Sequence, residues 1–200
     1  MIFHRLFGRP DDDDVAHDLY GEVVAQARRP EFYVSLGVPD TVDGRFDMIA
    51  VHAFLLLRRL KREGSEAAAA LAQGVFDLMF ADMDRNLREM GVSDLSIGRK
   101  VKQMTTAFHG RITVYEAGLE ETGGTALESA LVRNLFRGRE PAPPHLAAIA
   151  AYVRREAAAL DGQAYAALAA GRLVFGEPRL AAEGGAAEGG AAEGGIGDDG

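Results

Sequence analysis

Apolar side chains recur every three or four residues along most of this chain, which is the period of an amphipathic α-helix. In the clearest stretch, seven apolar positions are spaced by four, three, four, four, three and four residues, so they form one narrow stripe. The stripe contains Ile97, Val101, Met104, Phe108, Ile112, Tyr115 and Leu119. No segment shows the alternation of a half-buried strand. The pattern predicts an all-α fold, a single-domain bundle of about six or seven helices.

The helix boundaries are predicted from start and stop signals around the apolar runs. Residues 46–62 are apolar on almost every face and are expected to form the central helix. Pro30 is predicted to end the first helix, with a structured loop from Phe32 to Asp43, and Thr125 with Glu128 fits a capping box. The predicted helices are 11–27, 46–62, 65–90, 93 or 96–119, 125–136, 143–160 and a short one ending near 171.

Several polar residues on these helices were weighed as chemical sites. Asp11–Asp14 are interpreted as solvated charge favoured by the helix dipole, because consecutive helical residues point in different directions and make a poor metal cluster. His52 is interpreted as a core or edge histidine with a satisfied hydrogen bond rather than as a ligand. Asp77 and Asp84 are interpreted as a solvated face rather than an acid/base pair, with Arg88 placed to pair with Asp84.

The motifs that carry common enzyme chemistry are absent from the sequence. There is no Walker loop, no G-x-S-x-G, no G-x-G-x-x-G after a strand, and no H-E-x-x-H, EF-hand or E-x-x-H pair. The chain has no cysteine, which excludes disulfides and thiolate metal sites. Its five histidines are scattered along the sequence. We therefore expect a protein that is not an enzyme and that has no metal or cofactor.

Composition divides the 200 residues into two parts. The last segment repeats AAEGG three times, and such a stretch buries too little apolar surface to offset its ordering entropy. Residues 179–200 have one Arg against five acids, a net charge of −4, so residues 1–178 account for the other −4 of the total −8. We expect a helical chaperone-like domain over 1–178, a disordered tail over 179–200, and no DNA partner.

The tail gives a first testable prediction. Truncation after Pro178 is expected to leave the thermal stability almost unchanged, because the residues beyond it have almost no apolar surface to pack. Differential scanning calorimetry of the full-length and truncated proteins measures the difference in melting temperature. A large drop on truncation would show that the tail docks on the domain.

The start of the sequence lacks the long apolar region of a secretory signal, and no run approaches the ~18 apolar residues of a membrane span. These features predict a cytoplasmic location. Contact with the inner face of the cytoplasmic membrane, without crossing it, is compatible with them.

One helix has an unusual charge distribution. Residues 95–115 contain no acid, whereas Arg99, Lys100, Lys102 and Arg111 all fall within them. On a helical wheel, Arg99 and Lys102 lie opposite the apolar stripe, and Lys100 and Arg111 flank one edge of it. These four residues are our candidate partner-binding site, for RNA phosphate, anionic lipid or an acidic protein. The alternative is a solvated face whose aliphatic stems cover the edge of the core.

Three runs of sequence carry a resemblance to a known family. They read FYVSLGVPDTVDGRFDMIAVHAFLLLRRLK, then QGVFDLMFADMDRNLREMGVSDLSIGRKVKQM, then FHGRITVYEAGL, and lie within residues 32–119. The most specific stretch is residues 80–102, supported by Tyr33 and by the segment FHGRI that starts at Phe108. In these runs the chain resembles the ubiquinol–cytochrome c chaperone family.

The resemblance implies a helical, non-enzymatic protein that assists assembly of the cytochrome bc1 complex, respiratory complex III. Mitochondrial members of the family handle newly made cytochrome b, act with a small partner protein and dock near the ribosomal exit. The implied partners are cytochrome b or another bc1 subunit as client, the ribosome or an anionic membrane surface, and a small partner protein. The chain has no mitochondrial targeting segment, so the resemblance implies a bacterial-type member.

The residues alone leave a second function open. Phe and Met are abundant on the predicted helices 46–62 and 65–90. This abundance fits a small helical enzyme or a carrier for an apolar ligand such as a quinone, although core packing is the simpler explanation.

Overall fold

Helices account for all the regular secondary structure in residues 12–121 and 123–179, which are the parts of the chain that the computed structural model describes. The all-α prediction is confirmed. Two of the helical segments are short, with five residues in α2 and four in α8. In chain order the segments are α1 (Asp12–Ala27), α2 (Pro30–Val34), α3 (Val42–Glu63), α4 (Glu66–Glu89), α5 (Asp94–Glu120), α6 (Ala126–Asn134), α7 (Pro143–Asp161) and α8 (Tyr165–Leu168).

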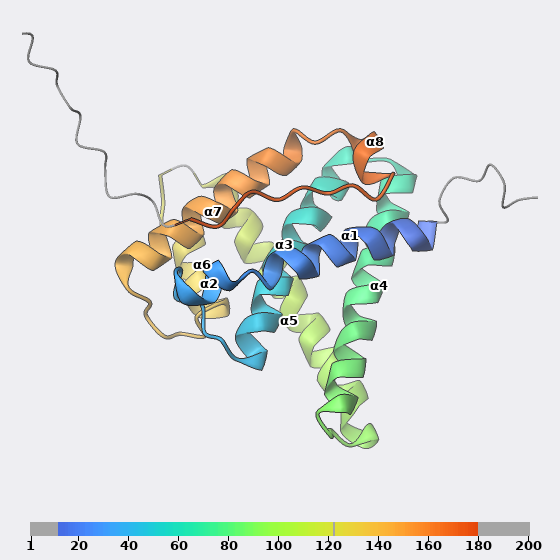
Figure 1. Cartoon of the computed structure of the whole chain (residues 1–200), viewed down its shortest axis with the longest axis horizontal. Helices are drawn as coiled ribbons and strands as arrows, with labels where there is room; N and C mark the ends of the chain where they lie inside the picture. The colour runs from blue at the N-terminus through green and yellow to red at the C-terminus, as the bar shows by residue number, and fades with distance from the viewer. Residues whose placement is uncertain (1–11, 122, 180–200) are drawn as a thin grey trace, which may run out of the picture.

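Helix α3 lies at the centre of the bundle, as its apolar faces predict. Residues 48–56 are all buried, because α1, α4 and α7 pack around them (Figure 1). The Thr41 hydroxyl caps the start of the helix by accepting a hydrogen bond from the Gly44 N–H at 3.0 Å. Gly64 ends it in the left-handed conformation, with φ of 72°.

Helices α4 and α5 form a hairpin whose tip extends beyond the other helices (Figure 1). The Ser65 hydroxyl caps α4 by accepting from the Ala68 N–H at 3.2 Å. Near the tip, Met83, Leu87 and Ile97 are buried, yet they are separate from the main hydrophobic core. The tip is therefore held by a small apolar group of its own, and a space remains between the hairpin and the body of the bundle.

The prediction for residues 30–43 was wrong in part. The first helix does end at Ala27, but Pro30 opens the short helix α2 instead of starting a loop. Proline fits the first turn of a helix because the N–H groups there have no acceptor within the helix. The N–H that proline lacks therefore costs no hydrogen bond. The turn closes when the Ser35 and Leu36 N–H groups donate to the carbonyl of Glu31.

The predicted capping box at the start of α6 is also wrong, although the helix begins where expected. The side chain of Thr125 makes no capping hydrogen bond. Instead the Glu121 carboxylate, five residues upstream, accepts from the Ala126 N–H at 2.9 Å. Glu128 forms an ion pair with Arg154 of α7, with an N–O distance of 2.7 Å. A long-range ion pair therefore replaces the local box.

The segment after α8 runs back along α7 (Figure 1). It is fixed at Gly176, whose N–H donates to Glu156 at 2.7 Å and whose carbonyl accepts from Gln26 at 2.8 Å. Pro178 is buried. The described chain therefore packs on the bundle up to Pro178, and the predicted tail lies outside the described residues apart from Arg179.

Within residues 12–121 and 123–179, none of the helices is both long enough and apolar enough to cross a membrane.

Candidate functional site

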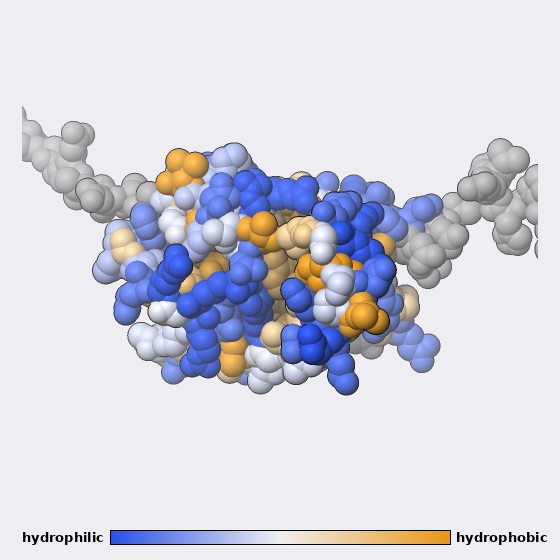
Figure 2. Space-filling view, turned by 90° about the horizontal axis from the view of Figure 1, so that it is seen from below, coloured by the Kyte–Doolittle hydropathy of each residue, from blue (hydrophilic) through white to orange (hydrophobic). Residues whose placement is uncertain are grey.

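A groove of about 780 Å³ lies between the α4–α5 hairpin and the first half of α3. Seen from below, this face is hollowed near its middle, with apolar side chains gathered in the hollow between hydrophilic flanks (Figure 2). The groove is lined by Arg28, Val42, Asp43, Arg45, Phe46, Ile49, Met83, Asn86, Leu87, Glu89, Met90, Lys100, Gln103, Met104, Ala107, Arg111 and Arg137.

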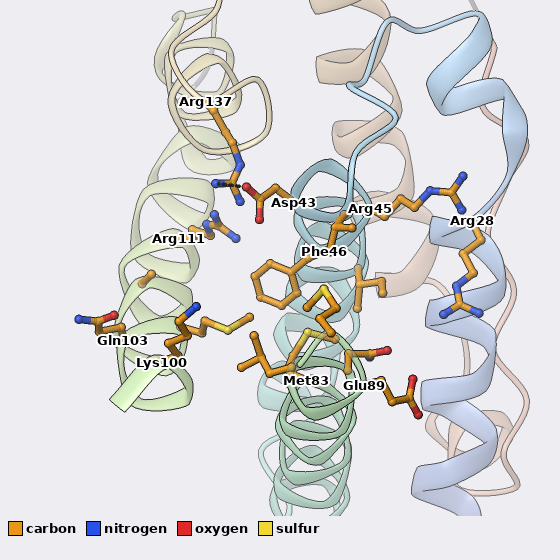
Figure 3. A pocket seen from close by; sticks show the side chains of 17 residues that line it. Arg28, Asp43, Arg45, Phe46, Met83, Glu89, Lys100, Gln103, Arg111 and Arg137 are labelled. Atoms are coloured by element: carbon orange, nitrogen blue, oxygen red, sulfur yellow. Dashed lines mark ion pairs between the residues drawn. The ribbon is translucent and has the colours of Figure 1, made fainter. Parts of the chain in front are cut away.

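The floor of the groove is apolar and rich in methionine. The Phe46 ring projects from α3 into the space beside α5, next to Met83 of α4 (Figure 3). Met90 and Met104 add two further thioethers from α4 and α5. Unbranched methionine side chains adapt to apolar surfaces of different shape. The floor therefore suits a flexible or variable apolar segment better than one small molecule of fixed outline.

One wall of the groove is an ion cluster around Asp47, whose carboxylate is 1% exposed. Arg111 of α5 and Arg137, which follows α6, each place a guanidinium nitrogen 2.7 Å from it. Arg137 also pairs with the exposed Asp43 at 3.1 Å (Figure 3). Burial raises the pKa of the Asp47 carboxyl, and the two guanidinium groups oppose that rise. The cluster ties α3, α5 and the turn after α6 together.

The geometry around this cluster is specific. Arg137 is the only non-glycine residue with a positive φ in the described parts of the chain, at 54°, and Gly138 follows at 74°. A left-handed arginine costs backbone energy, so the surrounding contacts must hold it in place. Arg111 lies over the Phe46 ring, with its guanidinium carbon 5.7 Å from the ring centroid. The charged wall and the apolar floor thus meet at Phe46.

The structure divides the four predicted partner-binding residues into two groups. Lys100 and Arg111 line the groove, as their position at the edge of the apolar stripe indicates (Figure 3). Arg111 is already paired with Asp47, whereas Lys100 makes no ion pair within the described residues. Arg99 and Lys102 are exposed and are not among the residues that line the groove.

Sequence reasoning missed Asp47 and Arg137. Asp47 had a detectable signal, because it is an acid inside the apolar run of residues 46–57, where a charge needs a partner. The partners themselves come from residues 64 and 90 positions further along the chain. No local sequence pattern indicates that Arg137 pairs with Asp47 or that it adopts a positive φ.

His52 is confirmed as a core residue. It is fully buried, and its Nδ1 donates to the Met48 carbonyl at 2.8 Å, which leaves Nε2 to accept from the Tyr152 hydroxyl at 2.8 Å. Gln26 donates to the same hydroxyl at 2.9 Å. Burial lowers the pKa of His52 to about 4, so the ring is neutral at physiological pH.

The acidic positions considered as chemical sites are engaged in local interactions. Gln73 donates to Asp77 at 2.7 Å, and Arg88 pairs with Asp84 at 2.6 Å. In the described residues, no group of three or more His, Cys, Asp or Glu side chains is arranged to hold a metal ion. Of the aspartates at 11–14, only Asp14 has a described side chain, and it is exposed.

Comparison with known protein families gives a match over most of the described fold. The model of the ubiquinol-cytochrome C chaperone family matches residues 34–175 of the 200. The chain belongs to this family. The matched region contains the whole of α3, α4, α5, α6 and α7, and it includes every residue that lines the groove except Arg28.

Curated relatives agree with the family assignment. The chain is 28% identical to human ubiquinol-cytochrome c reductase complex assembly factor 1 over 144 residues, which cover 72% of this chain and 47% of the human protein. It is 28% identical to the mitochondrial protein CBP3 of Saccharomyces cerevisiae, covering 76% of this chain and 46% of the yeast protein. The Xenopus laevis relative is 28% identical, with 66% of this chain and 64% of that protein covered. The chain thus spans between about half and two thirds of these relatives.

A solved structure supports the same fold. The crystal structure of the Cbp3 homolog from Brucella abortus is similar, with a TM-score of 0.75 and 36% sequence identity. The match covers 83% of this chain and 91% of the Brucella chain. The ubiquinol–cytochrome c chaperone fold is therefore shared with a bacterial relative over nearly its full length.

Proposed function

We propose that this chain is a non-enzymatic assembly chaperone of the ubiquinol–cytochrome c reductase complex. The observation that carries the proposal is the family match over residues 34–175, together with an open apolar groove inside the matched region. The name of the human relative supports it, since that protein is an assembly factor of that complex. The groove contains no arrangement of nucleophile and base, and Asp43, Arg111 and Arg137 of its wall belong to the ion cluster around Asp47.

We propose that the groove holds a segment of the client, which is cytochrome b or another subunit of the complex. A subunit of a membrane complex exposes apolar side chains until its neighbours cover them, and the methionine-rich floor offers such side chains a temporary partner. Lys100 adds a cation at the rim that makes no ion pair with the described residues, and it favours client segments that have an acidic residue beside the apolar ones.

We further propose that the protein works in the cytoplasm at the inner face of the membrane into which the client is inserted. The ribosome and a small partner protein, both implied by the family resemblance, are candidate partners for other surfaces. The groove leaves those surfaces free, because it occupies only the space between the hairpin and α3.

Filling the groove tests the client-binding proposal. Ala107 is an exposed residue of α5 that lines the groove, so a tryptophan there occupies the space without being forced into the core. In a strain that lacks the gene and expresses A107W, we expect reductase activity and cytochrome b absorbance to fall to those of the deletion strain. Reduced-minus-oxidised spectra and ubiquinol–cytochrome c reductase assays of membranes provide the measurement.

The matched control is A117W, at an exposed alanine of the same helix that does not line the groove. We expect this variant to restore wild-type activity. Normal complex in the deletion strain itself would contradict the chaperone function. Normal complex in the A107W strain alone would contradict the groove as the client site and leave the chaperone function standing.

The apolar floor of the groove also supports a second function, a carrier for an apolar ligand such as a quinone. Native mass spectrometry of the protein purified from its own host separates the two. A stoichiometric small molecule supports the carrier, and co-purified cytochrome b or another bc1 subunit supports the chaperone.

A further inference from the structure

A stripe of α5 faces solvent at the tip of the projecting hairpin. Leu95, Arg99 and Lys102 are spaced by four and three residues, so they share one side of the helix, opposite the buried Ile97 and Phe108. All three are exposed, and Leu95 is 100% exposed. We refer to Leu95, Arg99 and Lys102 as the tip stripe.

The tip stripe is positively charged on an acidic protein. Neither Arg99 nor Lys102 makes an ion pair within the described residues. Helix α5 has no acid between Asp94 and Glu116, and Arg88 pairs with Asp94 at 2.6 Å. Glu89, at the end of α4, lies on the side of the groove that faces Arg28, away from α5 (Figure 3). Among the residues that the structure describes, no carboxylate therefore forms an ion pair with either cation.

The tip also exposes large apolar side chains. Only five are strongly exposed in the described parts of the chain, and two of them are at this tip: Leu95 and Met90, which is 51% exposed. A surface that binds only phosphate groups, such as one for RNA, gains nothing from an exposed leucine. A bilayer surface does, because it offers anionic headgroups and an apolar boundary at adjacent depths.

We propose that the tip stripe docks on an anionic lipid bilayer. Leu95 enters the boundary between headgroups and acyl chains, and Arg99 and Lys102 contact lipid phosphates. The inference rests on the proposed location at the membrane, but it does not depend on which client the groove holds. Because the hairpin extends beyond the other helices, its tip reaches the bilayer first, and the groove at its side lies close to the surface (Figure 1).

Vesicle sedimentation tests the proposal with the full-length protein. At low salt, the protein is expected to bind vesicles of phosphatidylglycerol and phosphatidylcholine but not vesicles of phosphatidylcholine alone. The double variant R99Q/K102Q is expected to bind about 30-fold more weakly, which corresponds to about 2 kcal/mol for two cations near an anionic surface. The matched control R133Q/R139Q removes two exposed cations from α6 and the turn after it, and is expected to bind as the wild type does.

Replacing the leucine separates a bilayer from RNA. L95Q leaves the charge unchanged and is expected to weaken vesicle binding about tenfold, whereas it should not alter a purely electrostatic contact. Absence of wild-type binding to the anionic vesicles overturns the proposal, as does equal binding by the control and tip variants. Binding to ribosomes that L95Q leaves unchanged, without vesicle binding, assigns the stripe to RNA instead. The two proposals are tested separately, because vesicle binding is measured on the purified protein, whereas the chaperone function is measured as reductase activity in the deletion strain.

Discussion

Replacing Asp47 by Ala is expected to lower the free energy of unfolding by about 3 kcal/mol. The substitution removes the one buried carboxylate between two guanidinium groups, and the side chain of Arg111 is only 12% exposed. In the variant, the guanidinium charge of Arg111 remains largely desolvated without a counter-ion. We place the loss at the lower end of the range for broken buried pairs because Arg137 is 44% exposed and water can solvate it. Urea denaturation followed by circular dichroism at neutral pH measures the change.

Asp43 provides the matched control. It pairs with the same Arg137, but its side chain is 67% exposed. Replacing it by Ala is expected to cost less than about 1 kcal/mol, because exposed ion pairs are screened by solvent. Similar losses of unfolding free energy in the two variants would show that burial of Asp47 does not strengthen its ion pairs. A loss of less than about 1 kcal/mol for Asp47 would mean that the cluster is not what joins α3 to α5.

The helices could be predicted from the sequence because each depends on the apolar pattern of its own residues. The apolar period located α5, whose stripe does face inward, and the all-round apolar run located α3 at the centre of the bundle. The two errors, one in a boundary and one in a cap, have different causes. Proline is compatible with both the end and the start of a helix. The Thr–Glu pair has the spacing of a capping box, but the glutamate forms an ion pair with a distant arginine instead.

The groove was only partly predictable from the sequence. The helical wheel placed Lys100 and Arg111 at the edge of the apolar stripe, and both line the groove. It did not reveal that Arg111 is paired, because Asp47 comes from a helix 64 positions earlier. Nor did it show the space itself, which exists because the hairpin tip packs on a small apolar group separate from the main core. Such a gap depends on how whole helices meet and leaves no local signal.

The buried His52 leads to an expected loss of stability in acid. Its pKa is lowered to about 4 in the folded protein, against 6.5 for an unperturbed histidine. Between these values the unfolded chain binds a proton that the folded chain does not, so stability falls as the pH drops. A difference of about 2.5 pKa units at 1.36 kcal/mol each corresponds to roughly 3 kcal/mol, lost between about pH 6.5 and pH 4. Above pH 7 this contribution is constant, since the ring is neutral in both states.

Urea denaturation from pH 7 to pH 4 measures this effect, and variants separate it from the titration of carboxylates. H52Q removes the buried imidazole and is expected to flatten the decline by about 3 kcal/mol, whatever its stability at pH 7. H109Q, at an exposed histidine of α5, is the matched control. The hydrogen bonds explain why the folded state resists the proton. Nδ1 donates to the Met48 carbonyl, and Nε2 accepts from the Tyr152 hydroxyl. A second ring proton would have to bind to Nε2, and the hydrogen bond that Nε2 accepts from Tyr152 would be lost. Equal slopes for H52Q and the wild type would show that His52 is protonated as easily in the core as in the unfolded chain.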